Sequence, residues 1–145
     1  MAFLQTRAEL YQTIRLFFAE KNVLEVETPV LSAAASCDLN LESFSTMCVA
    51  DQLMYLQTSP EFAMKRLLAA GSGSIYQIAK SFRQSERGRF HNPEFTLLEW
   101  YRVGFSLPDL MEEMVELLML CFGQNLAFRT VTYQQIVQQL TGLNP

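Results

Sequence analysis

The chain has 145 residues, of which 50% are hydrophobic, 12% aromatic and only 18% charged. This composition provides ample material for a core and excludes a disordered chain. The net charge of −4 at pH 7 argues against a nucleic-acid-binding surface spread over the whole domain, because phosphate neutralisation requires clustered Lys and Arg. A local basic pocket remains possible.

The cysteines and the N-terminus indicate a cytoplasmic protein. Cys37, Cys48 and Cys121 are odd in number, widely spaced and without a CxxC pair, which argues against a disulfide framework or a zinc site. The first residues contain no apolar stretch with a basic lead, so we predict no signal peptide. The most apolar stretch, 110–122, is interrupted by glutamates and is predicted not to span a membrane.

The N-terminal part of the chain predicts a helix followed by short strands. Apolar residues at helical spacing predict an amphipathic helix over residues 7–20, opened by a capping box of Thr6 and Glu9. Residues 23–31 alternate apolar and polar, which predicts a strand that ends at its proline. Two further short strands are expected within residues 44–56.

A second helix is predicted after Ser59, with Ser59 at its cap and Pro60 in its first turn. It is expected to end at Gly71. The apolar residues expected on its buried side are Phe62, Leu67 and Leu68.

The rest of the chain predicts a hairpin and two helices. Residues 74–82 and 95–101 are typical of two antiparallel strands joined by a long charged loop. A third helix is predicted over residues 106–122, and a capping box of Thr132 and Gln135 predicts a short final helix. This order of elements predicts an α+β fold with a mainly antiparallel sheet.

The charged loop of the predicted hairpin is the first candidate site. Three arginines and the only histidine of this acidic chain fall within nine positions, 83–91. The planar guanidinium of Arg matches phosphate oxygens, so the cluster could hold a polyphosphate. From composition alone, a solvated loop tip with no specific partner is the more common explanation.

The returning strand contains a second candidate site. Glu99 lies in an otherwise apolar segment, where a carboxylate must face water or find a cationic partner. Glu99 and Tyr101 are two residues apart and therefore share one face of a strand, where together they could receive an ammonium group. The alternative is the outward polar face of a half-buried strand.

Two segments resemble the signature motifs of the class II lysyl-tRNA synthetases and their relatives. FRQSERGRFHNPEFTLLEWY, residues 82–101, is similar to motif 2, and VLEVETPVL, residues 23–31, resembles motif 1 with Pro29 as its proline. Within this group, LQTSPEFAMKRLLAAGSG, residues 56–73, resembles the elongation factor P–lysine lysyltransferase family, which modifies a protein instead of a tRNA. The predicted motif 1 helix begins near residue 7 and leaves no room for an anticodon-binding OB domain, so tRNA is not expected as the acceptor.

The resemblance implies an ATP-dependent ligase of cytoplasmic translation. Lysine or β-lysine would be activated by ATP, with Mg²⁺, to an aminoacyl-adenylate, and then transferred to a lysine side chain of elongation factor P. It also implies a homodimer formed through motif 1. A catalytic fragment of a lysyl-tRNA synthetase and a non-catalytic dimerisation or binding module remain alternatives.

The resemblance also implies roles for individual residues. Arg83 would contact the α-phosphate and stabilise the transition state, His91 would lie near the ATP tail, and Asn92 and Phe95 would hold the adenine. Relatives with FRNE place a glutamate at the position of Ser85, whereas relatives with FRNGE place it at that of Glu86, so either residue could contact ATP. The implied ATP-binding residues are Arg83, Ser85, Glu86, His91, Asn92 and Phe95.

The implied amino-acid site has two parts. Glu61 in the Ser59-Pro60-Glu61 stretch would receive the substrate amino group, while Glu99 and Tyr101 would face the distal ammonium. No metal-ligating side chains are expected. The implied substrate-binding residues are Ser59, Pro60, Glu61, Glu99 and Tyr101.

Motif 3, with its second ATP-binding arginine, has no counterpart before Pro145. We therefore expect residues 1–145 to form a partial class II catalytic domain. On its own, this chain is expected to show little or no ATP–pyrophosphate exchange.

Overall fold

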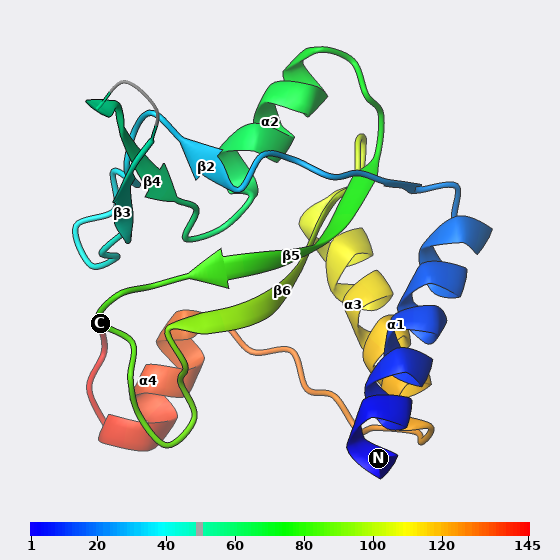
Figure 1. Ribbon diagram of the computed structural model, residues 1–145. Coiled ribbons are helices and arrows are strands. Elements are labelled where there is room, and N and C mark those ends of the chain that lie inside the picture. The colour runs from blue at the N-terminus through cyan, green and yellow to red at the C-terminus, as the bar shows by residue number, and fades with distance from the viewer. Residues whose placement is uncertain (49–50) are drawn as a thin grey trace. The chain divides into compact units, whose positions relative to one another are not determined.

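The computed structural model describes residues 1–48 and 51–145, which form two compact units, Met1–Ser106 and Leu107–Pro145 (Figure 1). The elements of the first unit are α1 (Ala2–Glu20), β1 (Leu24–Glu25), β2 (Leu31–Ser32), β3 (Ser45–Met47), β4 (Leu53–Leu56), α2 (Glu61–Ala69), β5 (Ile75–Phe82) and β6 (Glu94–Tyr101). Those of the second unit are α3 (Leu107–Phe122) and α4 (Tyr133–Thr141).

The strands form two three-stranded sheets, in the orders β1-β5-β6 and β2-β4-β3. The long hairpin predicted from the sequence is confirmed: β5 and β6 pair antiparallel, with Ile75 opposite Tyr101 and Phe82 opposite Glu94. Among the strands of the described residues, only β1 is parallel to its neighbour, β5. The predicted α+β class with a mainly antiparallel sheet is therefore confirmed.

Helix α1 is longer than predicted. It begins at Ala2, and the capping box predicted at Thr6 is wrong, because the Thr6 hydroxyl lies inside the helix and donates to the carbonyl of Ala2 at 3.1 Å. A threonine can make this bond to the preceding turn in mid-helix, so its presence does not by itself mark a helix start. Of the apolar residues predicted to form its buried face, Ile14, Phe17 and Phe18 are buried, whereas Leu10 is 37% exposed.

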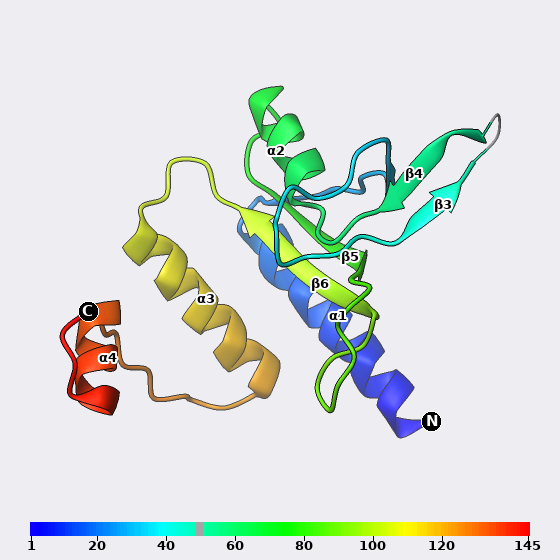
Figure 2. The ribbon, with the colours of Figure 1, turned by 90° about the vertical axis from the view of Figure 1, so that its left-hand side faces the viewer.

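One face of the hairpin packs against α1 (Figure 2). The Phe18 ring stacks on Tyr76 of β5, with 4.4 Å between ring centroids, and lies 5.8 Å from Trp100 of β6. Arg7 donates to the hydroxyl of Thr96 at 2.7 Å. Because side chains alternate along a strand, the residues between these positions project from the opposite face.

The single strand predicted over residues 23–31 is wrong. Its start forms β1 beside β5, whereas its end forms β2, which pairs antiparallel with β4 in the other sheet. Between them, the buried hydroxyl of Thr28 donates to the side-chain oxygen of Gln77 at 3.0 Å. Alternation of apolar and polar residues indicates an extended backbone but does not identify the strand that pairs with it. A segment that passes from one sheet to another therefore has the same sequence pattern as a single strand.

Helix α2 begins one residue later than predicted, with Pro60 at the N-cap. The Ser59 hydroxyl still accepts the backbone N–H of Glu61, at 3.1 Å. Its fully buried residue is Met64, whereas Phe62, predicted to be buried, is 57% exposed. The rotation of so short a helix depends on how its start is anchored, which apolar spacing does not reveal.

Both predicted helices of the second unit are present. The capping box of α4 is confirmed, since the Thr132 hydroxyl accepts the Gln135 N–H at 3.1 Å and the Gln135 side chain accepts the Thr132 N–H at 2.8 Å. Across the described part of the chain, no helix combines the length and apolar character needed to cross a membrane.

Candidate functional site

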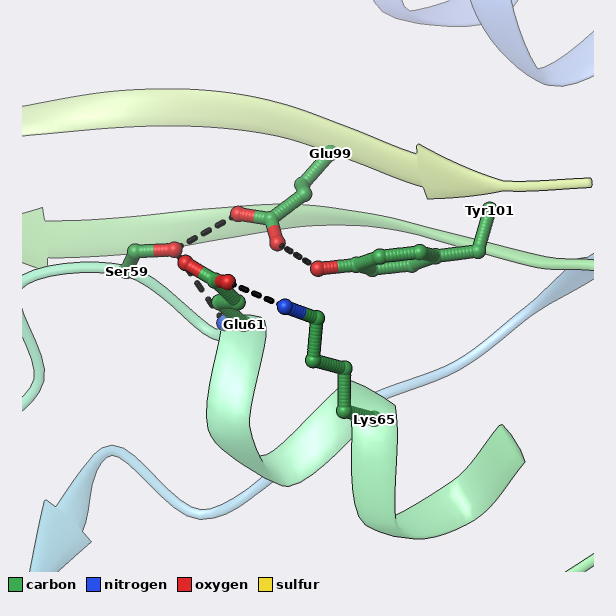
Figure 3. A network of polar contacts seen from close by, with 5 residues as sticks. All are labelled: Ser59, Glu61, Lys65, Glu99 and Tyr101. Carbon is green, nitrogen blue, oxygen red and sulfur yellow. Dashed lines mark hydrogen bonds and ion pairs between the residues drawn. The ribbon is translucent and has the colours of Figure 1, made fainter. Parts of the chain in front are cut away.

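The hairpin face opposite α1 contains a carboxylate fixed between two hydroxyl groups (Figure 3). Glu99 accepts a hydrogen bond at 2.6 Å from Tyr101, which lies two residues along β6 on the same face. Its other carboxylate oxygen accepts a hydrogen bond from Ser59, also at 2.6 Å. All three side chains are half-buried, so water competes only partly for these bonds.

The environment of Tyr101 keeps its hydroxyl protonated. Burial, followed by the hydrogen bond to Glu99 and the negative charges of Glu99 and Glu61, raises the pKa of Tyr101 well above its ordinary value. At neutral pH the phenol is therefore a hydrogen-bond donor that holds one oxygen of Glu99 in place. The remaining lone pairs of this carboxylate can accept further hydrogen bonds from a cation.

A second carboxylate lies beside this group, at the start of α2 (Figure 3). Glu61 is the first residue of the helix and pairs with Lys65, one turn later, with 2.5 Å between Nζ and Oε1. The hydrogen bond to Glu61 is the largest of the effects that raise the pKa of Lys65, and the charge of Glu99 contributes as well. Two carboxylates and one lysine ammonium thus share this region.

Arg83 follows β5 directly and lies against Phe95 of β6. Its guanidinium carbon is 5.0 Å from the centroid of the Phe95 ring, its Nε donates to the carbonyl of Thr58 at 3.3 Å, and its Nη1 pairs with Glu86 at 3.1 Å. Its backbone N–H donates to the carbonyl of Pro93 at 2.9 Å, so hairpin pairing continues one residue beyond the strands. These contacts fix a half-buried guanidinium beside an aromatic ring.

Ser85 and Glu86 have different partners in the loop after β5. Glu86 pairs with Arg83, whereas the Ser85 hydroxyl donates to the carboxylate of Glu42, a residue of the segment before β3. The carbonyl of Glu42 also accepts the backbone N–H of Gln84 at 2.9 Å. Glu42 therefore holds the first turn of the loop at two points.

The remaining loop residues point to solvent. His91 and Asn92 are exposed, and the backbone groups of Gly88 and His91 bond to each other at 3.1 and 3.4 Å, which closes the loop on itself. The structure thus brings Arg83, Glu86 and Phe95 together and leaves His91 and Asn92 at the surface. Pro60 is buried at the start of α2.

The segment before α2 connects the two groups of residues. The carbonyl of Thr58 accepts from Arg83, and the hydroxyl of the next residue, Ser59, donates to Glu99. Along β6, Phe95 and Glu99 project from the same face four residues apart, a separation of about 14 Å at 3.4 Å per residue. The guanidinium and the ring of the Arg83–Phe95 pair therefore lie toward one end of this strand face, and the carboxylate of Glu99 lies four residues further along β6.

A comparison with protein families now identifies the fold. Residues 1–144 match the family model described as "tRNA synthetases class II (D, K and N)". The chain belongs to this class II synthetase family.

Several curated relatives are about half identical to this chain in sequence. The chain is 52% identical over 147 residues to the elongation factor P–(R)-β-lysine ligase of Vibrio atlanticus (strain LGP32), 53% identical over 150 residues to that of Pseudoalteromonas translucida (strain TAC 125), and 49% identical over 150 residues to that of Yersinia pestis (strain Pestoides F). These alignments cover 98–100% of the chain but only 45–46% of each relative. The chain therefore spans about half the length of the curated relatives it matches.

Two further residues that contact the candidate site, Lys65 and Glu42, were not predicted from the sequence. Lys65 could have been found from its position one turn after Glu61, since side chains four apart on a helix are neighbours. Glu42 gives no such signal, because it lies in an irregular segment 43 residues from Ser85. Only the tertiary structure brings it to the loop.

Proposed function

We propose that this class II domain provides the nucleotide-binding and amine-binding surface of an ATP-dependent ligase. The enzyme would join lysine or β-lysine to a lysine side chain of elongation factor P. The observation that supports this most strongly is the position of Glu99, fixed by Ser59 and Tyr101 on the same strand face as the Arg83–Phe95 pair. The names of the relatives support the choice of amino acid and acceptor.

Recognition of the amino acid follows from the two carboxylates. Glu99 would accept the distal ammonium, since both of its oxygens are already oriented and a half-buried carboxylate gains from a cationic partner. Glu61 would receive the other amino group. The Tyr101 ring and the Ser59 hydroxyl would set the orientation of the substrate's hydrocarbon chain between the two carboxylates.

Activation would proceed by displacement at the α-phosphorus of ATP. A carboxylate oxygen of the amino acid forms the new P–O bond, the bond to the bridging oxygen breaks, and pyrophosphate leaves with that electron pair. Arg83 would offset the charge that builds up on the phosphoryl oxygens, and Phe95 would stack on the adenine. In the second step the target lysine amine attacks the acyl carbon, AMP leaves, and the amine loses a proton.

The loop residues would complete the nucleotide site. Ser85, Glu86, His91 and Asn92 border the Arg83–Phe95 pair in sequence and would contact the ribose, the base or the terminal phosphates. Outside residues 49–50, no three His, Cys, Asp or Glu side chains cluster to form a metal site. Mg²⁺ would enter with the phosphates of ATP, whose charge it neutralises.

The same proposal includes a homodimer formed through α1 and β1. Apolar side chains on this part of the chain are exposed, which favours their burial against a second copy. They include Phe3, Leu4, Leu16 and Leu24. All three cysteines are free thiols, which fits the proposed cytoplasmic location.

Acyl transfer tests the proposal directly. The complete gene product would be incubated with ATP, Mg²⁺ and labelled lysine or β-lysine, and offered either elongation factor P or tRNA. We expect label on the protein, none on the tRNA, and loss of labelling in an Arg83→Met variant. Labelled tRNA with unlabelled elongation factor P would instead favour a lysyl-tRNA synthetase.

A further inference from the structure

Lys65 places a cation of the protein itself in the region proposed for the substrate's amino groups. Its Nζ lies 2.5 Å from Oε1 of Glu61, and the Lys65 side chain extends from α2 toward the strand that bears Glu99 and Tyr101 (Figure 3). This lysine thus places a positive charge beside the side chains of Glu61 and Glu99. In the structure, Glu61 is already paired with an ammonium group, that of Lys65, where the substrate's amino group would bind.

We propose that Lys65 is an internal competitor for Glu61, displaced by the substrate amino group that binds there, and that it thereby sets selectivity among amines. The inference rests on the proposed function, because it assumes that Glu61 receives an amino group. It adds a specificity-determining residue that touches no reacting atom.

The location of Lys65 suits reversible displacement. Its side chain is 56% exposed and that of Glu61 46% exposed, so the ammonium can leave into water without being stranded in an apolar environment. Ion pairs of this exposure are weak, so a ligand ammonium held by additional contacts can replace them. The apparent affinity of the ligand is then reduced by the fraction of molecules in which Lys65 occupies Glu61.

Selectivity among amines follows because Lys65 competes only with the amino group that binds to Glu61. Lysine has an amino group for Glu61 and a second for Glu99, whereas 6-aminohexanoate has only the distal ammonium. Removing Lys65 should therefore improve the binding of lysine without improving that of 6-aminohexanoate. A general change in electrostatic potential would affect both ligands.

The test uses the 145-residue chain and three variants, Lys65→Met, Lys65→Arg and Arg66→Met. Arg66 is the next residue of α2 and is exposed, so its replacement removes the same charge from the same helix without removing the ion pair to Glu61. Affinities for lysine and for 6-aminohexanoate would be measured by NMR titration. We expect Lys65→Met to bind lysine about two- to fivefold more tightly than Arg66→Met does, with no difference for 6-aminohexanoate and no gain for Lys65→Arg.

A second measurement follows Lys65 itself. On saturation with lysine, the ¹⁵Nζ resonance of Lys65 should shift toward that of a solvated lysine, whereas 6-aminohexanoate should leave it in place. Equal affinities of Lys65→Met and Arg66→Met for lysine, with an unshifted Nζ resonance, would overturn the inference while leaving the amine site intact. Failure of lysine to bind any of these chains would overturn the proposed site itself.

Discussion

Replacing Glu99 by Gln removes the charge proposed to bind the distal ammonium and preserves the shape of the side chain. Ser59 and Tyr101 can still bond to the amide, because a hydroxyl can either donate or accept. The variant should therefore fold normally. Any loss of ligand affinity would then reflect the missing charge and not a rearrangement of the neighbouring side chains.

The expected loss can be derived from the surroundings of Glu99. Hydrogen bonds to charged groups contribute about 1.5–3 kcal/mol. Glu99 is half-buried, so partial screening by water places its contribution at about 1.5–2 kcal/mol. This corresponds to lysine binding that is weaker by about 10- to 30-fold.

Calorimetric or NMR titration of the chain with lysine measures this loss, and two controls isolate its cause. Norleucine has the lysine chain without the distal ammonium, so its affinity should be the same for wild type and Glu99→Gln. Glu94→Gln makes the same charge change on the same strand, where Glu94 pairs with the exposed Lys80 on the other face. An equal loss for norleucine, or for Glu94→Gln, would refute ammonium recognition by Glu99.

Three further predictions concern the nucleotide, the core and the pH dependence of stability. Arg83→Met should weaken ATP binding about 10- to 100-fold through loss of a charge-assisted contact, measured by titration with ATP; unchanged binding would exclude Arg83 from the site. Phe18→Ala should lower the free energy of unfolding in urea by about 3–5 kcal/mol, because the ring is fully buried, whereas exposed Phe62→Ala should change it by less than about 0.5 kcal/mol. Burial, with the hydrogen bond to Glu25, raises the pKa of Tyr76 from 10.0 to about 12. The unfolded chain therefore ionises first, so the stability due to Tyr76 is complete below pH 10 and is lost between pH 10 and 12; alkaline unfolding of a Tyr76→Phe variant should lack this loss.

Local patterns predicted the hairpin and most of the helices because those elements are defined by neighbours in sequence. The alternation over residues 74–82 and the capping box at Thr132 are each contained within one segment of the chain. The path of residues 23–31 is different, since it depends on partners in two separate sheets. The burial of Met64 in place of Phe62 likewise depends on how α2 is anchored to the rest of the unit.

In the candidate site, too, contacts between neighbours in sequence could be predicted, whereas contacts between distant segments could not. That Glu99 and Tyr101 share a face follows from strand geometry, and their 2.6 Å hydrogen bond is its direct consequence. The presence of Ser59 as the second partner of Glu99 could not be predicted, because 40 residues separate the two and only the tertiary structure brings the segment before α2 beside β6. The contact of Glu42 with the loop after β5 could not be predicted from the sequence for the same reason.

Ser59 shows why a serine followed by a proline suits the junction between α2 and the carboxylate of Glu99. A hydroxyl has one proton to donate and lone pairs to accept, and Ser59 uses both, donating to Glu99 and accepting the N–H of Glu61. Pro60 between them has no N–H that could compete for the hydroxyl, and its ring fixes φ, at −74°, as the chain enters the helix. The position of α2, the orientation of Glu99 and the placement of the second carboxylate are therefore coupled through one side chain, so that the two proposed amine contacts form as a unit.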